Sequence, residues 1–306
     1  MLAISLIPSL SGADKWITPG FVLFVGLVFG LTFGNVYSSF NKKMSKYLLQ
    51  YSVVGLGFGM NAYSAINTGK EGMLFTIVSV FGTLAIGWFL GRRLLKVNKN
   101  TSYLISSGTA ICGGSAIAAV SPLIKAKNEE ISVALATVFV LNAVALFIFP
   151  SIGRLFEMSE QQFGTWAAIA IHDTSSVVGT AKVYGEQALN VATTIKLTRA
   201  LWIVPLAFLT SFLFKAKDEK VRIPMFIILF VCAMLFNTYY LADNFPALSK
   251  FITALSKKAI TLTMFFIGSS ISVAMLRNVG AKTFLQGLLL WIVISVATLL
   301  YVVSFV

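Results

Sequence analysis

The sequence has few charged side chains: Asp, Glu, Lys and Arg make up only 11% of its 306 residues, against about 25% in a typical soluble protein. Hydrophobic residues account for 57% of the chain, and the mean hydropathy is +0.86. A soluble domain this apolar could not cover its surface with polar groups. The composition therefore excludes a soluble globular protein and predicts an all-α polytopic membrane protein.

Histidine and cysteine are scarce as well. His172 is the single histidine, which excludes a multi-histidine zinc or haem site. Cys112 and Cys232 both lie in apolar segments and form neither a disulfide framework nor a metal-ligand spacing. We therefore expect neither a metal nor a cofactor.

Acidic residues are rarer than basic ones: the chain has 11 Asp and Glu against 24 Lys and Arg, which gives a formal net charge of +13. On a soluble protein this excess would suggest nucleic-acid binding. Here most of the basic residues lie in short loops between long apolar runs, as in the cytoplasmic loops of membrane proteins. We expect the lipid bilayer, and not nucleic acid, to be the partner.

Ten apolar runs approach the roughly 20 residues that a spanning helix needs. They are 16–37, 47–66, 73–91, 101–124, 131–152, 163–182, 187–214, 223–240, 251–275 and 283–306. Residues 1–10 lack the basic start of a signal peptide and look like the end of a shortened eleventh span. No connection is long enough for a soluble domain, so residues 1–306 are predicted to form a single transmembrane domain.

The basic residues also predict the orientation. Lys196 and Arg199 lie inside the seventh run, and the other 22 divide fourteen to eight between alternate sides. The side with fourteen includes the loops 92–99 and 215–222, and it is expected to be cytoplasmic. This places the C-terminus outside.

An internal symmetry is also indicated. A glycine followed by an Asn-x-Gly motif recurs at a constant offset of 211 residues, as Gly57 with 67–69 and Gly268 with 278–280. The two segments are seven spans apart, an odd number, so they would run in opposite directions. The pattern favours two inverted five-helix repeats, 16–152 and 160–306.

Three charged residues, Asp173, Lys196 and Arg199, lie deep inside the predicted spans. Asp173 is the only acidic one, and a charge at the bilayer centre costs roughly 2.5–3.5 kcal/mol on insertion scales. Lys196 and Arg199 share one helix face through their i, i+3 spacing. Two buried cations against one buried acid leave about one positive charge that an anion would balance. The alternative is that Asp173 only caps a helix and pairs with Arg199.

Small polar residues interrupt three of the runs, at 113–115, 173–176 and 268–270. We expect discontinuous helices there, whose freed backbone groups bind a substrate, and close helix packing is the alternative. The candidate substrate-binding residues are Cys112, Gly113, Gly114, Ser115, His172, Asp173, Ser175, Ser176, Lys196, Arg199, Gly268, Ser269 and Ser270.

His172 is the only side chain with an unperturbed pKa near neutrality. If it lines the same cavity, its protonation adds a positive charge beside the anion, so that proton and anion bind together. The alternative is that His172 stays neutral, because burial and two nearby cations disfavour its charged form. H+ and Na+ are the candidate coupling ions.

Several of these residues also occur together in a known family. The stretch ICGGSAIAAVSPLIKA (111–126), the pair His172-Asp173 followed by two valines, and Lys196-x-x-Arg199 follow one another in that order. The sequence thereby resembles the YeiH family of bacterial membrane proteins, which are described as sulfate exporters. Relatives commonly have Glu at the position of Asp173, and often Cys-Gly-Ala in place of Cys-Gly-Gly.

The resemblance implies the architecture of the bile-acid symporter and sodium/proton antiporter group. That architecture has inverted five-helix repeats, crossed broken helices and an elevator-type motion. The implied location is the bacterial inner membrane, with a homodimer as one assembly to be tested.

The sequence thus predicts a secondary transporter of a small anion, with sulfate or a related oxyanion or sulfonate as the first candidate. A sodium/proton antiporter-like cation transporter is the alternative. A remote third function is an intramembrane serine hydrolase using Ser115 and His172, although Gly-Gly-Ser-Ala lacks the final glycine of Gly-x-Ser-Gly. We expect no enzymatic activity.

Overall fold

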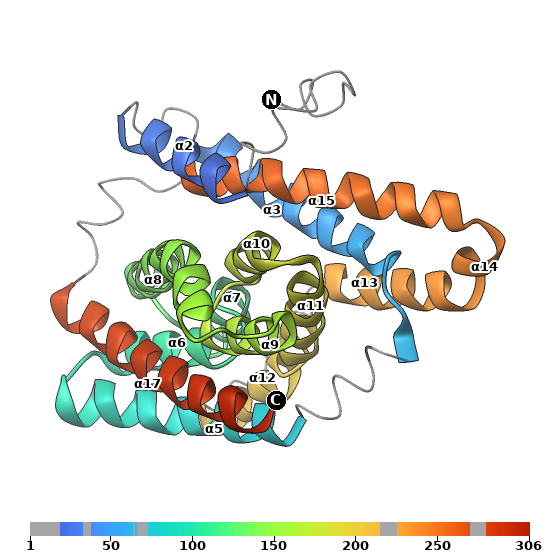
Figure 1. Ribbon diagram of the computed structural model, residues 1–306. Coiled ribbons are helices and arrows are strands. Elements are labelled where there is room, and N and C mark those ends of the chain that lie inside the picture. Colours follow the sequence, from blue (N-terminus) through green and yellow to red (C-terminus); the bar gives the residue numbers. More distant parts are fainter. Residues whose placement is uncertain (1–18, 33–37, 64, 66–72, 215–224, 270–279) are drawn as a thin grey trace.

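The computed structural model describes residues 19–32, 38–63, 65, 73–214, 225–269 and 280–306 (Figure 1). All regular structure in these residues is helical, as the composition predicts. The elements are α2 (Pro19–Thr32), α3 (Ser38–Gly57), α5 (Met73–Phe89), η3 (Leu90–Leu94), α6 (Lys99–Ala110), α7 (Gly114–Val120), α8 (Asn128–Leu155), α9 (Glu160–Ala170), α10 (Thr174–Tyr184), α11 (Glu186–Ala200), α12 (Ile203–Phe214), α13 (Met225–Phe236), η4 (Asn237–Leu241), α14 (Ala242–Asn244), α15 (Pro246–Ser269) and α17 (Ala281–Phe305).

Each of the ten predicted runs overlaps helical residues, but the second begins earlier than expected. Helix α3 starts at Ser38, nine residues before the predicted run. Its three lysines are polar and therefore end the apolar run, but lysine has a high helix propensity and the helix continues through them. Five described stretches are long and apolar enough to cross a membrane: Phe75–Leu94, Asn128–Leu155, Glu186–Phe214, Met225–Asn244 and Ala281–Phe305. The higher predicted number stays a prediction, and residues 1–10 lie outside the described part.

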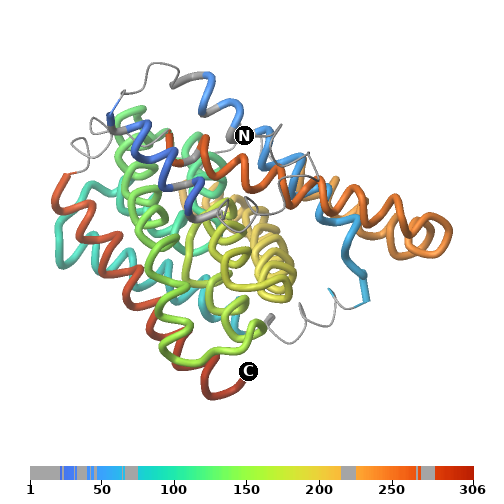
Figure 2. The backbone as a smooth tube through the Cα atoms, turned by 45° about the horizontal axis from the view of Figure 1, so that its top comes forward, coloured from blue at the N-terminus to red at the C-terminus, as the bar shows by residue number. Residues whose placement is uncertain are grey.

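The helices form three layers (Figures 1 and 2). Helices α6 to α12 make up the central layer, α5 and α17 cover one side, and α2, α3 and α15 cover the other. Helix α15 packs along α2 and α3 and reaches the central layer through α10. The central layer therefore holds the interrupted segments and the buried charges.

The fourth predicted run does not cross the molecule; it folds back as a hairpin of α6 and α7. The Asn100 side chain, at the start of α6, donates a hydrogen bond to Glu130 at the start of α8 (3.1 Å). Since α8 follows directly after α7, both ends of the hairpin lie at the same end of α8. The predicted crossing by 101–124 is therefore wrong. At about 18 Å, twelve-residue α6 is too short to cross a 30 Å hydrocarbon core.

The sixth predicted run forms a second hairpin, from α9 and α10. The Tyr184 hydroxyl, at the end of α10, donates to the carbonyl of Met158 just before α9 (2.6 Å). The Phe163 and Tyr184 rings stack with centroids 3.7 Å apart. The Glu160 carboxylate accepts the amide of Gln187, at the start of α11 (2.7 Å). The crossing predicted for 163–182 is therefore also wrong.

The two hairpins enter from opposite ends of the central layer. The Lys99 ammonium, at the start of α6, lies 4.7 Å from the centroid of the Phe214 ring at the end of α12. Tyr103 and Thr210 share a hydrogen bond at the same end (2.6 Å). Helix α8 runs from this end to the end at which the α9–α10 hairpin enters. Helices α11 and α12 then run back to the first end.

This arrangement changes the count of basic residues on each side. Lys125 and Lys127 follow the first hairpin and join the side with fourteen, whereas Arg154, at the end of α8, moves to the other side. With these three changes, the division of Lys and Arg becomes fifteen to seven. The bias that predicts a cytoplasmic start of α6 becomes stronger, and the C-terminus is still predicted to lie outside.

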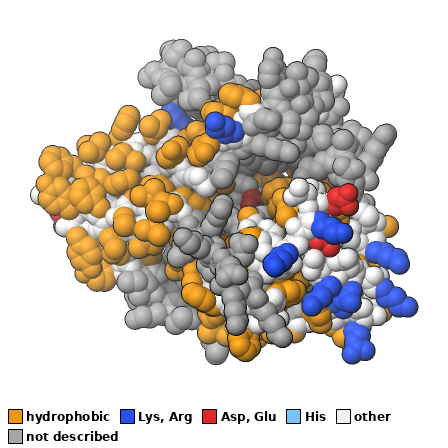
Figure 3. Space-filling model, turned by 180° about the vertical axis from the view of Figure 1, so that it is seen from behind, with side chains coloured by type: hydrophobic (Ala, Val, Ile, Leu, Met, Phe, Trp, Pro, Cys, Tyr) orange, Lys and Arg blue, Asp and Glu red, His pale blue; other side chains and the backbone are white. Residues whose placement is uncertain are grey.

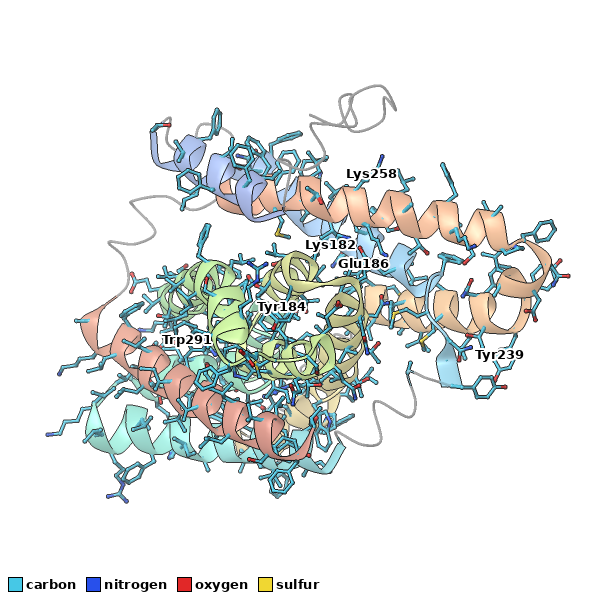
Figure 4. All side chains as sticks on the ribbon, viewed as in Figure 1. Lys182, Tyr184, Glu186, Tyr239, Lys258 and Trp291 are labelled. Atoms are coloured by element: carbon cyan, nitrogen blue, oxygen red, sulfur yellow. The ribbon has the colours of Figure 1, made fainter. Side chains whose placement is uncertain are left out.

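An ion-pair cluster joins the central layer to α15. Glu186 pairs with Lys182 on α10 and with Lys257 on α15. Figure 4 shows Lys182 and Glu186 on the side of the central layer that faces α15. Partly exposed pairs of this kind contribute about 0–1 kcal/mol, so the cluster is a weak tie between the layers.

The surface has an apolar end and a basic end (Figure 3). Exposed aromatic side chains cover η4 and α14, among them Tyr239, Tyr240 and Phe245. Arg92 and Arg93 are exposed in η3. Aromatic residues of this kind favour the interface of a bilayer.

The hairpins predict which sides Lys127 and Arg154 face. In a Cys232→Ser background, Arg154→Cys should react with a membrane-impermeant maleimide added to intact cells. Lys127→Cys should react only after permeabilisation, because the first hairpin returns to the cytoplasmic side. A C-terminal green fluorescent protein fusion, which matures in the cytoplasm, should stay dark. The reversed labelling pattern would mean that both segments cross the membrane.

Candidate functional site

The tips of the two hairpins meet at the centre of the molecule. The α6–α7 tip is formed by 111–113 and the α9–α10 tip by 171–173. Gly113 has φ +62°, and a Cβ on it would lie 3.4 Å from the Asp173 Cα and 3.3 Å from the Val138 side chain. The left-handed φ is the feature that favours glycine there, and the second tip lies within van der Waals contact of the position.

Two cations of α11 bind the carbonyl ends of both hairpins. Arg199 donates to the Ala110 carbonyl through Nε (2.8 Å) and Nη2 (2.5 Å), and to the Ile169 carbonyl through Nη1 (3.5 Å). The Lys196 ammonium donates to the Ile171 carbonyl (2.8 Å). Both cations are fully buried. They satisfy carbonyls that lack a partner within α6 and α9 and that carry the negative end of each helix dipole.

Asp173 caps the second half of its hairpin. Its carboxylate accepts hydrogen bonds from the Ser175 amide (2.9 Å) and the Ser175 hydroxyl. This confirms the predicted N-cap at the start of α10. The alternative ion pair with Arg199 does not form, because the guanidinium donates to backbone carbonyls instead. Asp173 is the one ionisable group at this crossing of the tips that is partly exposed.

His172 lies next to these charges, fully buried. Neither ring nitrogen has a hydrogen-bond partner among the described residues. Ser115 lies in the first turn of α7 and is half-buried. The hydrogen-bonded Ser115–His172 pair that a serine hydrolase would need is therefore not formed in this structure.

Asn142 of α8 is a site residue that the sequence analysis missed. Its side-chain oxygen accepts the backbone amides of His172 (3.0 Å) and Asp173 (3.4 Å), and only 2% of the residue is exposed. It therefore holds the open backbone of the second tip. A signal was present, because Asn142 is the only carboxamide in the apolar run 131–152.

The structure brings ten of the thirteen candidate residues to the crossing, from three separate runs: Cys112, Gly113, Gly114, Ser115, His172, Asp173, Ser175, Ser176, Lys196 and Arg199. Gly268 and Ser269 instead lie in the last turn of α15, which packs on α2 and α3. Helix α15 includes Gly268 and ends at Ser269, so the break expected at 268–270 falls at the edge of the described residues and stays a prediction. Ser270 lies outside the described residues.

The fold and the crossing define a multi-pass membrane protein with half-helix hairpins. The chain matches the family described as Conserved hypothetical protein 698 over residues 2–287, and it belongs to that family. It is 62% identical over 301 residues to a UPF0324 membrane protein of Bacteroides thetaiotaomicron, covering 98% of this chain and 91% of the relative. A UPF0324 membrane protein of Porphyromonas gingivalis is 57% identical over 299 residues, covering 97% and 91%.

No solved structure matches the chain. The names of these relatives establish a bacterial membrane protein and state no substrate. The resemblance to sulfate exporters therefore stays a prediction.

The backbone at the first tip predicts different effects for two adjacent glycines. Gly113→Ala should lower the free energy of unfolding by about 1–3 kcal/mol, because alanine strongly disfavours φ +62° with ψ −122°. Gly114→Ala is the matched control, since its new methyl would meet only side-chain atoms, the end of the Phe139 ring at 3.3 Å and the end of Leu135 at 3.5 Å. The measurement is the thermal unfolding midpoint in detergent. Equal midpoints for the two variants would contradict the geometry of the tip.

Proposed function

We propose that this protein is a secondary transporter of a small anion, with sulfate or a related oxyanion or sulfonate as the first candidate. The observation that carries the proposal is the charge at the crossing. Lys196 and Arg199 are both buried there, and Asp173 is the acidic side chain beside them. The three side chains leave a formal excess of one positive charge.

The half-helix ends leave this excess intact. The carbonyl ends of α6 and α9 carry about half a negative charge each, and the amide ends of α7 and α10 about half a positive charge each. These contributions cancel, so an excess of about +1 remains beside two helix interruptions. A bound anion would balance it.

The same arithmetic favours proton coupling for a divalent anion. Sulfate carries two negative charges, and the crossing supplies about one positive charge. A proton on His172 would supply the second, and both of its ring nitrogens are without a partner among the described residues. Sulfate and one proton would then bind together.

The hairpins and layers support an elevator-type alternating access. Each hairpin enters from its own end, and their tips meet between those ends. The central layer is tied to α15 by the partly exposed pairs of Glu186, which are weak enough to break. Movement of the central layer against α2, α3 and α15 would carry the crossing from one side to the other.

A cation transporter of the sodium/proton antiporter kind is the second candidate. It is favoured by the partial exposure of Asp173, the only carboxylate at the crossing. Against it, that carboxylate already binds the start of α10, and two buried cations lie on the neighbouring helix. Repulsion by these charges makes the crossing a poor cation site.

The test is uptake of radiolabelled sulfate, thiosulfate, phosphate, alkyl sulfonates and sodium into proteoliposomes under imposed pH and sodium gradients. We expect uptake of an anion, and a loss of at least about tenfold in Arg199→Gln, which removes a bidentate charged donor. Arg154→Gln, at an exposed arginine, is the matched control.

Arg199→Lys keeps the charge and loses the fork of donors, so it should transport at an intermediate rate. Folding of each variant is checked by its elution as a single species. Normal anion uptake by folded Arg199→Gln would overturn the role of this residue. Sodium uptake without anion uptake would select the cation transporter.

The pH dependence tests His172 separately. The charged groups that act on the ring are Lys196 and Arg199 of α11, and Asp173 follows His172 directly in the chain. If the ring binds the coupled proton, anion affinity should rise as the pH falls from about 8 to about 5.5, and His172→Gln should flatten this rise. The same pH dependence in the variant would move the proton to another group.

A further inference from the structure

We infer that the side-chain nitrogen of Asn142 is a direct ligand of the transported anion. The inference rests on the proposed function and deepens it, because it identifies a neutral donor that selects for hydrogen-bond acceptors. It begins from the orientation of the Asn142 amide. The side-chain oxygen faces two backbone N–H groups, those of His172 and Asp173.

Because both partners are donors, the amide can be placed in only one way. The oxygen must lie towards the second tip, and its two lone pairs are used there. The nitrogen, with two N–H groups, is directed away from those backbone amides. It has no acceptor among the described residues, although Asn142 is 98% buried.

The surroundings of Asn142 place this donor at the crossing. Val138, one turn earlier on α8, contacts Gly113 of the first tip. Leu146, one turn later, lies near Gly179 of α10. One face of α8 therefore runs along both hairpins, with Asn142 between these contacts.

The chemistry of the free group favours an anion over a cation. A metal cation needs oxygen ligands, and the only oxygen of the Asn142 side chain is already used by the backbone. An oxyanion accepts hydrogen bonds and donates none, so it matches the two free N–H groups. Lys196 and Arg199 supply the positive charge that attracts the anion, whereas the neutral amide supplies hydrogen-bond donors that orient it.

The test is sulfate binding to the purified protein in nanodiscs, measured for the wild type, Asn142→Asp and Asn142→Ser. Both variants lose the N–H donors. Asn142→Asp keeps an oxygen where it can accept the two backbone amides, whereas the shorter serine keeps a hydroxyl on Cβ that does not reach them. We expect each folded variant to bind sulfate about ten- to a hundredfold more weakly, with the thermal midpoint of Asn142→Asp close to that of the wild type. Asn190→Asp and Asn190→Ser, at an exposed position of α11, are the matched controls.

Comparing the two variants separates the effect of the lost N–H donors on sulfate binding from the effects of an added negative charge and of misfolding. Asn142→Ser adds no charge, so a loss confined to Asn142→Asp would overturn the inference and assign the effect to repulsion. Sulfate binding within twofold of the wild type in Asn142→Ser would also overturn it. If Asn142→Asp does not fold, Asn142→Ser alone decides. A wild type that binds no anion refutes the proposed function itself, before any variant is compared.

Discussion

The hydrogen bonds from Arg199 and Lys196 to backbone carbonyls are the interaction on which the centre of this molecule depends. A helix that stops inside a membrane leaves its last carbonyls without partners and without water, at a cost of several kcal/mol each. Two hairpins double that cost. One helix, α11, carries both cations and reaches the carbonyl ends of α6 and α9 at the same time. The tips can therefore be non-helical and still be buried.

This use of the cations also explains why Asp173 is left for another task. An ion pair with Arg199 would have left the carbonyls of Ala110 and Ile169 unsatisfied. The structure instead separates the charges by helix polarity, with cations at the carbonyl ends and the carboxylate at the amide end of α10. Each charge is stabilised by a helix dipole of opposite sign. The charges do not cancel pairwise, and this keeps an excess of positive charge at the crossing.

Much of the fold and part of the site could be predicted from sequence. Composition alone identified a helical membrane protein, and Gly113 and Asp173 marked both interruptions, since glycine and an N-cap residue disturb an apolar run visibly. Whether an interrupted run crosses or returns could not be predicted. Both outcomes need about 20 apolar residues, and the difference lies in contacts such as that between Tyr184 and Met158, which are distant in sequence. The hydrogen-bond partners of Arg199 could not be predicted either. They are backbone carbonyls, which every residue type has, so no sequence signal marks them.

The arrangement of the hairpins relates different segments from those that the glycine pattern paired. In 99–155 a hairpin is followed by the long helix α8, and in 160–214 a second hairpin is followed by α11 and α12. The hairpins of these two units enter the central layer from opposite ends. The fourth predicted run thus shares its hairpin form with the sixth, whereas the pattern with an offset of 211 pairs the second run with the ninth. Two returning segments also cancel in the count of crossings, so the prediction that the C-terminus lies outside does not depend on whether these two segments cross.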